Sequence, residues 1–340
     1  MSRSWNVAVL GATGLVGEML LTVLAERKFP VKELFPLASS RSLGKKVRFN
    51  GREWPVIDVA TFDFSRVQIG LFSAGGDVSA QYAPKAAAAG CVVIDNTSHF
   101  RYEEDIPLVV PEVNPADIAQ YKARGIIANP NCSTIQMVVA LKPIYDAVGI
   151  ERINVATYQA VAGAGRKAVE ELATQTAQLL NGRPVEPKVI ARQIAFNCVP
   201  QIDKFLDNGY TKEEMKMHWE TRKIFHDSQI RVNATTVRVP VFYGHSEAVH
   251  IETRRKISAA DARALLEKAP GVAVLDERRP GGYPTAVTEA ANHDTVYVGR
   301  IRDDISHDRG LDLWVVADNI RKGAATNAVQ IAEILVRDYL

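Results

Sequence analysis

Short apolar runs alternate with helix-like segments through the first third of the chain. Four segments have the length and composition of buried strands: residues 6–10, 34–38, 67–72 and 91–95. Helical segments are predicted at residues 19–24 and 79–89, between these strands. Because the two kinds of segment alternate, the pattern predicts parallel strands joined by right-handed crossover connections, and therefore an α/β fold.

A glycine-rich turn follows the first apolar run. It reads Gly11-Ala12-Thr13-Gly14-Leu15-Val16-Gly17 and leads directly into a predicted helix. Between a strand and a helix, such glycines let backbone N–H groups approach a pyrophosphate at the helix N-terminus. We therefore predict a Rossmann-type dinucleotide-binding domain. A tight turn without a ligand is the alternative interpretation.

The residues after the second predicted strand favour NADP over NAD. An NAD site has an Asp or Glu there, which accepts a hydrogen bond from the ribose 2′-hydroxyl. This chain instead has Ser39-Ser40-Arg41-Ser42, followed by Lys45 and Lys46. Hydroxyl and guanidinium groups bind a 2′-phosphate through charge-assisted hydrogen bonds, so NADP(H) is the predicted cofactor. The alternative interpretation is a solvated basic turn, which predicts no discrimination between NADP and NAD.

Composition excludes several classes of protein. With 340 residues the chain exceeds what one core usually organises, so two domains are expected. A formal net charge of +2 gives no reason to expect a nucleic-acid or membrane partner. The N-terminal residues, from Met1, lack the apolar stretch of a signal peptide. The three cysteines are odd in number and widely spaced, and CxxC and HExxH are absent. We expect a cytoplasmic protein with neither a disulfide framework nor a metal site.

Cys132 is the strongest candidate for chemistry. It lies in Asn129-Pro130-Asn131-Cys132-Ser133-Thr134, directly before an apolar run at residues 135–141. This order predicts a turn that feeds a helix N-terminus, where unpaired N–H groups and the helix dipole favour a reactive thiolate. The same helix is expected to end near Lys142-Pro143. A small buried hydrophobic residue is the alternative interpretation of a lone cysteine.

Further candidates lie in the second half, where predicted strands at residues 154–158 and 231–243 flank a helix at residues 166–180. Arg238 belongs to the second strand, which Pro240 marks as an edge strand or a bulge. His245 follows a glycine, which permits special backbone geometry beside it, but the pattern alone favours a structural histidine. Glu213 and Lys216 are three residues apart on a predicted helix and so share one face.

Eight blocks of the chain resemble aspartate-semialdehyde dehydrogenases. In order they are GATGLVG, FSAGG, FR at Phe100-Arg101, PNCST, TYQAVAGAG, EEMKM, RVPVFYGHSE and VVADNIRKGAATNA. The resemblance covers essentially the whole chain. It implies NADPH-dependent reductive dephosphorylation of L-aspartyl 4-phosphate to L-aspartate 4-semialdehyde. This step supplies lysine (through diaminopimelate), methionine, threonine and isoleucine.

The resemblance also implies the domain organisation. Residues 1–130, with a C-terminal helix at about 324–340, would bind NADP. Residues 131–320 would form an α+β catalytic and dimerisation domain, which suggests a homodimer.

The positions that match the family's motifs imply a role for each candidate residue. Cys132 would be the nucleophile that forms a thioester, His245 the general acid/base and Gln159 the residue that orients the substrate. Substrate contacts would come from Arg238 (α-carboxylate), Glu213 (ammonium group), and Arg101, Lys216 and Asn131 (phosphate). Cofactor contacts would come from Gly11, Thr13, Gly14, Leu15, Val16, Ser40, Arg41, Ala162, Gly163 and Asn319.

One departure from the family pattern concerns the cofactor. The family segment usually reads SGAG where this chain has Ala162-Gly163-Ala164-Gly165. The missing hydroxyl is expected to weaken a cofactor contact while the backbone path persists.

Four alternatives compete with this interpretation. N-acetylglutamyl-phosphate reductase and glyceraldehyde-3-phosphate dehydrogenase also combine a Rossmann domain with a cysteine, but their local blocks fit less well. A Cys–His hydrolase would leave the glycine turn unexplained. A non-catalytic paralogue would have no need of the reactive side chains that this chain retains.

Overall fold

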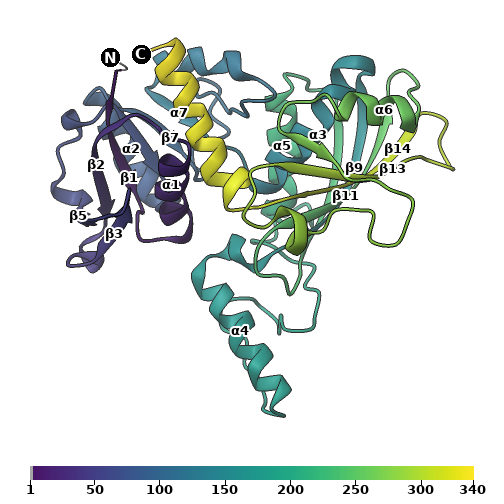
Figure 1. The fold of residues 1–340 in the computed structure, drawn as a ribbon, viewed down its shortest axis with the longest axis horizontal. Helices are drawn as coiled ribbons and strands as arrows, with labels where there is room; N and C mark the ends of the chain where they lie inside the picture. The colour runs from purple at the N-terminus through teal and green to yellow at the C-terminus, as the bar shows by residue number, and fades with distance from the viewer. Residues whose placement is uncertain (1–2) are drawn as a thin grey trace. The chain divides into compact units, whose positions relative to one another are not determined.

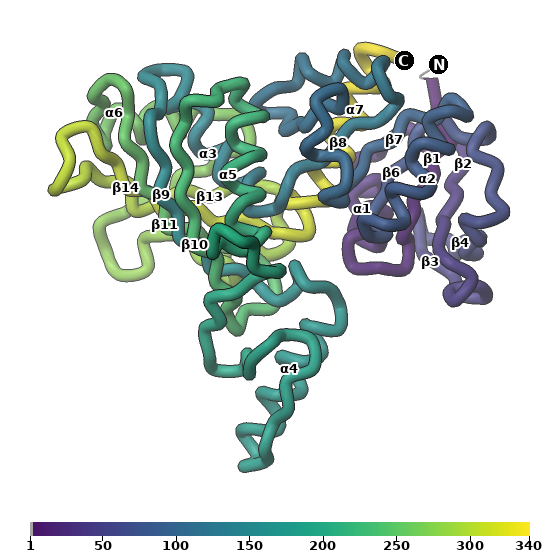
Figure 2. Tube along the Cα trace, turned by 180° about the vertical axis from the view of Figure 1, so that it is seen from behind, coloured from purple at the N-terminus to yellow at the C-terminus, as the bar shows by residue number. Residues whose placement is uncertain are grey.

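The structure, a computed structural model, describes residues 3–340. Met1 and Ser2, with which the expected N-terminal segment starts, lie outside the described residues. The chain forms two compact units (Figures 1 and 2). The first unit runs to Asn131 and also includes Ala324–Leu340, and the second unit is Cys132–Gly323. Each unit is described by itself.

The first unit contains a six-stranded sheet of order β5-β2-β1-β6-β7-β8. Every pairing in it is parallel, as the alternation of strands and helices predicts. The strands are β1 (Trp5–Leu10), β2 (Val31–Ala38), β5 (Ile57–Asp58), β6 (Ile69–Phe72), β7 (Val92–Asp95) and β8 (Ile126–Ala128). A separate antiparallel pair consists of β3 (Lys46–Phe49) and β4 (Arg52–Pro55).

The described part of the first unit contains the α-helices α1 (Leu15–Glu26), α2 (Gly76–Ala88) and α7 (Thr326–Asp338). The last of these comes from the end of the chain. Val329, Ile331 and Leu335 of α7 are fully buried in the same core as Leu20 and Leu24 of α1. The C-terminal helix is therefore part of the core that supports the parallel sheet.

The second unit contains a mixed sheet of order β10-β9-β11-β14-β13-β12. Its strands are β9 (Ile150–Gln159), β10 (Arg231–Arg238), β11 (His245–Thr253), β12 (Val272–Val274), β13 (Val296–Asp303) and β14 (Gly310–Ala317). β9 pairs with β10 in parallel and with β11 in antiparallel orientation. β10 lies at the edge of the sheet, which confirms the expectation based on Pro240. The expected extension of this strand to Tyr243 is wrong, because β10 ends at Arg238, ahead of the proline.

Helices α3 (Cys132–Val148), α5 (Lys212–Ile224) and α6 (Ala259–Leu266) pack against this sheet. Helix α4 (Arg166–Leu180), which agrees with the predicted bounds, projects away from the sheet in both views (Figures 1 and 2). Within residues 3–340, none of the helices combines the length and the apolar character that crossing a bilayer requires.

The expected end of the helix near Lys142-Pro143 is wrong. Helix α3 continues to Val148 with Pro143 inside it. Proline removes one backbone hydrogen bond from a helix interior, at a cost of about 3 kcal/mol. Leu141 and Ile144 flank the proline and are fully buried, so their packing offsets this cost.

Candidate active site

Three strand ends bring Arg238, Gln159 and His245 into one row. Arg238 ends β10 directly opposite Gln159, which ends the parallel strand β9. His245 begins β11, whose next residue, Ser246, pairs with Tyr158 of β9. The side chains of Arg238, Gln159 and His245 are all buried. Strand register therefore assembles the row from residues that are far apart in the sequence.

Cys132 is the first residue of α3, which confirms the predicted helix N-terminus. Its Sγ lies 3.2 Å from Nε2 of His245. The helix packs on β9 and β11, the strands that hold Gln159 and His245. In this position, both the positive end of the helix and an adjacent imidazole favour the thiolate form of a cysteine.

The His245 ring is held neutral. Burial, and secondarily the charge of Arg238, lower the pKa of His245 to about 3. The backbone N–H of Ala160 donates to Nδ1 at 3.0 Å, which assigns the ring proton to Nε2, the nitrogen beside the sulfur. The charge of Glu213 and the backbone of Gly244 favour the protonated ring and oppose this lowering only in part.

The Gln159 amide is fixed at both ends. The Thr157 hydroxyl donates to its Oε1 at 3.0 Å, and its Nε2 donates to Oε1 of Glu213 at 3.1 Å. Nε2 also lies 3.4 Å from Nε2 of His245. The amide thus presents an N–H group beside the imidazole, in a position suited to orienting a bound oxygen atom.

Glu213 and Lys216 form a largely buried ion pair. Lys216 Nζ lies 2.8 Å from Oε2 of Glu213 and 3.0 Å from Oδ2 of Asp203. Burial lowers the pKa of Lys216, but the two carboxylates outweigh it and raise the pKa above its usual value. Asp203 has a left-handed backbone with φ of 67°, unusual for a residue other than glycine. The sequence interpretation did not include Asp203.

Helix α5, which carries Glu213 and Lys216, begins with a complete capping box. The Thr211 hydroxyl accepts from the Glu214 N–H, and the Glu214 carboxylate accepts from the Thr211 N–H. The second oxygen of Glu214 accepts from the N–H of Thr236 on β10. One carboxylate therefore fixes the helix start and ties it to the strand that ends at Arg238.

Arg238 is held by a hydrogen bond to a backbone carbonyl, and it has room because the neighbouring Gly163 lacks a side chain. Its Nη1 donates to the Ala160 oxygen at 2.7 Å. A Cβ at Gly163 would lie 3.0 Å from Nη1 and 3.5 Å from the His245 ring. Gly163, predicted as a cofactor contact, thus also gives Arg238 and His245 their space. Burial lowers the pKa of Arg238, and the charges of Glu213 and Cys132 oppose this.

Gly323 has a comparable role beside Cys132, and the sequence interpretation missed it. A Cβ at Gly323 would lie 2.8 Å from the Cβ of Cys132. Such a distance cannot be tolerated without moving the start of α3. The signal available in the sequence was a glycine within the block VVADNIRKG, but it does not identify the contact.

The first unit holds the predicted dinucleotide turn. Gly11 has φ of 87°, and a Cβ at Gly17 would lie 2.0 Å from the Gly11 oxygen, so both positions require glycine. Helix α1 begins at Leu15, followed by Val16, and Gly14 provides no side-chain cap. The first N–H groups of this helix are therefore suited to a pyrophosphate.

Ser40 and Arg41 are exposed in a short 3₁₀ turn directly after β2. Thr13 of the glycine turn lies close by, with its Oγ1 3.5 Å from Oγ of Ser42. Hydroxyls and a guanidinium thus collect at the carboxyl end of β2. This set can donate charge-assisted hydrogen bonds to a polar or anionic group at this position.

Two further predicted cofactor residues lie in the second unit. Asn319 accepts from the Gly244 N–H at 2.9 Å, while its buried Nδ2 has no partner among the described residues. An unpaired buried amide donor suits a polar ligand group. Ala162 is 2% exposed and supplies no hydroxyl, in line with the departure noted in its sequence block.

Arg101 and Asn131, the remaining predicted substrate residues, are described with the first unit. Both are buried, and Arg101 donates from Nη2 to the Asn96 oxygen at 2.8 Å. The residues that the structure brings together within the second unit are Cys132, Gln159, Glu213, Lys216, Arg238 and His245.

Two family models match the chain. Residues 6–121 match the NAD binding domain of semialdehyde dehydrogenase, and residues 141–322 match its dimerisation domain. An aspartate-semialdehyde dehydrogenase of Legionella pneumophila is 67% identical over 340 residues, covering 100% of this chain and 98% of the relative. The chain belongs to the aspartate-semialdehyde dehydrogenase family.

Solved structures of this family have the same fold. Aspartate semialdehyde dehydrogenase II of Vibrio cholerae, in a complex with ASA, is 65% identical with a TM-score of 0.98 and covers 100% of both chains. An aspartate semialdehyde dehydrogenase of Candida albicans, solved with NADP, is 27% identical with a TM-score of 0.75 and covers 98% of each chain.

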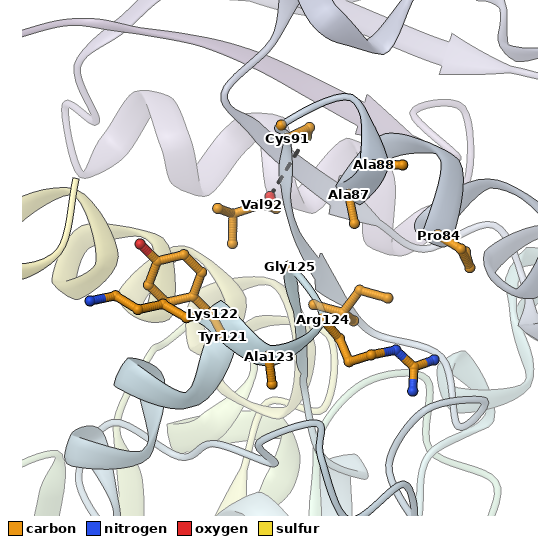
Figure 3. Close-up of a pocket in the computed structure, with 12 residues that line it drawn as sticks. Pro84, Ala87, Ala88, Cys91, Val92, Tyr121, Lys122, Ala123, Arg124 and Gly125 are labelled. Carbon is orange, nitrogen blue, oxygen red and sulfur yellow. Dashed lines mark hydrogen bonds between the residues drawn. The ribbon is translucent and has the colours of Figure 1, made fainter.

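The other two cysteines of this family member are unlike Cys132. Cys91 is 1% exposed beside a hollow between α2 and residues 121–126 (Figure 3), and its thiol donates to the Val92 oxygen at 3.7 Å. Burial raises the pKa of Cys91 to about 12, so it stays a thiol. Cys91 therefore belongs to the buried core. Cys198 is exposed and unpaired.

Proposed function

We propose that the chain catalyses the reversible, NADPH-dependent reductive dephosphorylation of L-aspartyl 4-phosphate to L-aspartate 4-semialdehyde. The observation that carries this proposal is the 3.2 Å contact between Cys132 Sγ and His245 Nε2, at a helix N-terminus and beside a buried arginine. Membership of the aspartate-semialdehyde dehydrogenase family supports the choice of substrate. The product feeds lysine, methionine, threonine and isoleucine synthesis.

The first chemical step belongs to Cys132. Its thiolate attacks the acyl carbon of aspartyl phosphate, a sulfur–carbon bond forms, and the carbon–oxygen bond to phosphate breaks with its electrons on the leaving phosphate. The Nε2–H of His245 lies in position to stabilise the thiolate before attack. The result is a thioester on Cys132.

When bound, the reduced nicotinamide supplies the hydride that reduces this thioester. His245 gives a proton to the former carbonyl oxygen as the hydride adds to the carbon. It takes this proton back as the carbon–oxygen double bond re-forms, the carbon–sulfur bond breaks and the thiolate is restored. Gly244 assists, because its backbone favours the ring when it carries a second proton. General acid–base catalysis of this kind typically contributes about 10²–10⁴-fold.

The charges around the row match those of the substrate. Arg238 presents a rigid guanidinium that can hold the α-carboxylate through two hydrogen bonds. Glu213 lies next to Gln159 and can meet the ammonium group. Lys216, which Glu213 and Asp203 keep charged, is a candidate for the phosphate. Arg101 keeps its predicted phosphate role as a prediction.

We infer that the cofactor is NADP(H). Ser40 and Arg41 at the end of β2 support this choice, and no carboxylate of the turn Ser40–Ser42 competes with a 2′-phosphate. The Candida albicans relative was solved with NADP. A homodimer in the cytoplasm is the assembly we propose, since residues 141–322 match a dimerisation domain and none of the three cysteines forms a disulfide within residues 3–340.

The central test is a phosphate-dependent oxidation of aspartate semialdehyde with NADP⁺. Cys132→Ala should abolish turnover and leave NADPH binding unchanged, whereas Cys198→Ala, which removes an exposed thiol, should retain turnover. Signal with another aldehyde only, or turnover without phosphate, would redirect the assignment. Loss of NADPH binding in Cys132→Ala would count against separate roles for the thiol and the cofactor residues.

Two substitutions test the binding roles. Arg238→Lys should raise KM for the semialdehyde at least about tenfold, because a point charge loses the two-pronged geometry. Arg41→Ala should raise KM for NADP⁺ and leave KM for NAD⁺ unchanged. An unaltered KM in either variant would remove that residue from its proposed role.

A further inference from the structure

Glu247 lies in the fully buried layer between β11 and α3. It follows His245 by two positions on the strand, so both side chains point to the same face. Helix α3 covers that face, and Gln136 stands one helical turn after Cys132. Gln136 on α3 therefore faces Glu247 on β11, as Cys132 faces His245. The second pair lies one helical turn further along α3 and two residues further along β11.

Three acceptor oxygens in this layer have no hydrogen-bond partner among residues 3–340. They are the two oxygens of the Glu247 carboxyl and Oε1 of Gln136. Nε2 of Gln136 is already directed at the carbonyl oxygen of His245, at 3.5 Å. A buried polar atom without a partner is costly, and an ionised carboxylate there would add an unpaired buried charge.

We propose that Glu247 is a neutral carboxylic acid in the folded protein, donates its hydroxyl proton to Oε1 of Gln136, and through Gln136 positions His245 beside Cys132. One added proton satisfies two of the three oxygens, because the carboxyl gains a donor and the amide oxygen becomes its acceptor. Burial favours the same state, since it raises the pKa of Glu247 well above its usual value, and the interaction with Gln136 opposes this only in part.

The elements packed against Glu247 offer no cation that would keep it ionised. The residue directly across on β9 is Thr157, and the one across on β14 is Val315. On α3 the titratable side chain of this layer is the thiol of Cys132, and on β11 it is the neutral ring of His245. Among residues 3–340, Glu247 forms no ion pair.

The inference rests on the proposed role of His245 at Cys132. Helix α3 reaches His245 at two points: the thiol contacts the imidazole at 3.2 Å, and the Gln136 amide contacts the carbonyl at 3.5 Å. Loosening the second contact lets the imidazole shift relative to the sulfur. Glu247 acts through Gln136 and is therefore a positioning residue.

The first test compares urea unfolding of full-length wild type and Glu247→Gln between pH 5 and pH 7. Glutamine has the shape of the protonated acid and cannot ionise. In the unfolded chain Glu247 ionises near pH ~4.3, whereas the folded wild type must keep it neutral, so only the wild type loses stability as the pH rises. The two unfolding equilibrium constants should diverge about tenfold per pH unit over this range.

Glu252→Gln is the matched control, because Glu252 lies on the same strand, is partly exposed and has its carboxylate 4.0 Å from Arg152. Its unfolding constant should keep a fixed ratio to that of the wild type. A fixed ratio for Glu247→Gln as well would mean that Glu247 is ionised in the folded protein, and would overturn the proposal.

The second test measures alkylation of Cys132 by iodoacetamide, which needs no turnover, in a Cys198→Ala background. Glu247→Leu removes the proton donor and should change the alkylation rate about fivefold, in the direction of His245→Asn. Glu247→Gln should restore the wild-type pH profile, because its amide N–H can donate to Gln136. Circular dichroism and NADPH binding establish that each variant is folded.

The outcomes separate this inference from the proposed function. If His245→Asn is alkylated like the wild type, the pair of Cys132 and His245 is wrong, and the proposed function fails with it. If His245→Asn differs but Glu247→Leu matches the wild type, only the positioning role is refuted. A profile of Glu247→Gln shifted to lower pH would indicate that a negative charge had been removed, and would refute the neutral carboxyl.

Discussion

Replacing Gly163 by alanine inserts one methyl group next to Arg238. The added Cβ would lie 3.0 Å from Nη1 of Arg238, whereas ordinary contacts of this kind are about 3.5 Å. The guanidinium must therefore move by about 0.5 Å. It has little freedom to do so, because it is 6% exposed and donates to the Ala160 oxygen at 2.7 Å.

The expected cost falls on the hydrogen bonds between the displaced guanidinium and the substrate carboxylate. A hydrogen bond to a charged group is worth about 1.5–3 kcal/mol, and a displacement of this size forfeits about half of it. About 1 kcal/mol corresponds to an increase of roughly fivefold in KM for aspartate semialdehyde. The His245 ring would lie 3.5 Å from the new methyl group, an ordinary contact, so the pair of Cys132 and His245 should be spared.

Two assays separate these effects. Steady-state kinetics report KM, and the rate of Cys132 alkylation reports the thiol directly. Gly163→Ala should raise KM and leave the alkylation rate within about twofold. Ala164→Gly, in the same 3₁₀ turn, alters the backbone without adding an atom beside Arg238 and serves as the control.

A double-mutant cycle provides the refutation. In an Arg238→Lys background no guanidinium remains for the methyl group to displace, so Gly163→Ala should cost little more. If Gly163→Ala raises KM by the same factor in both backgrounds, its effect does not pass through Arg238. An unchanged KM in the single variant would show that the guanidinium does not bind the substrate carboxylate.

Three further outcomes follow from the site. Because burial lowers the pKa of His245 to about 3, the wild type should lose up to about 1.4 kcal/mol of stability per pH unit as the pH falls below ~6.5. Urea titrations from pH 6.5 to pH 5 should show a flatter loss for His245→Asn, and parallel curves would contradict this. Gly323→Ala places a Cβ 2.8 Å from the Cβ of Cys132 and should slow the alkylation of Cys132 about tenfold. An unaltered rate would show that the start of α3 can move without affecting the thiol. Thr211→Ala breaks the capping box of α5 and should lower the free energy of unfolding by about 1 kcal/mol. An unchanged midpoint of urea unfolding would contradict this.

Features that depend on neighbouring residues were predictable from the sequence. The glycine turn, the start of α3 at Cys132 and the edge position of β10 each follow from residue types within a few positions. Backbone geometry at such places is set locally, by missing side chains, missing N–H groups or helix-end chemistry. Pro143 is the exception, because the packing of the residues around it outweighs its local preference.

Contacts that depend on strand register were not predictable. Arg238 and Gln159 face each other only because β9 and β10 pair in parallel with one register, and no local pattern encodes that choice. Asp203 meets Lys216 from a loop, and Gly323 meets Cys132 from the other end of the second unit. Family resemblance pointed to the reactive side chains, but not to these neighbours that confine them.

The return of the chain to its first unit has a consequence for biosynthesis. The core beneath the parallel sheet includes Ala328, Val329, Ile331 and Leu335, all from α7 at the C-terminus. On the ribosome, the nucleotide-binding half must wait for the roughly two hundred residues after Asn131, about 10–40 s of elongation, before its core can close. A nascent or prematurely terminated polypeptide therefore exposes the apolar side of α1 and its strands, which makes it a natural client for chaperones.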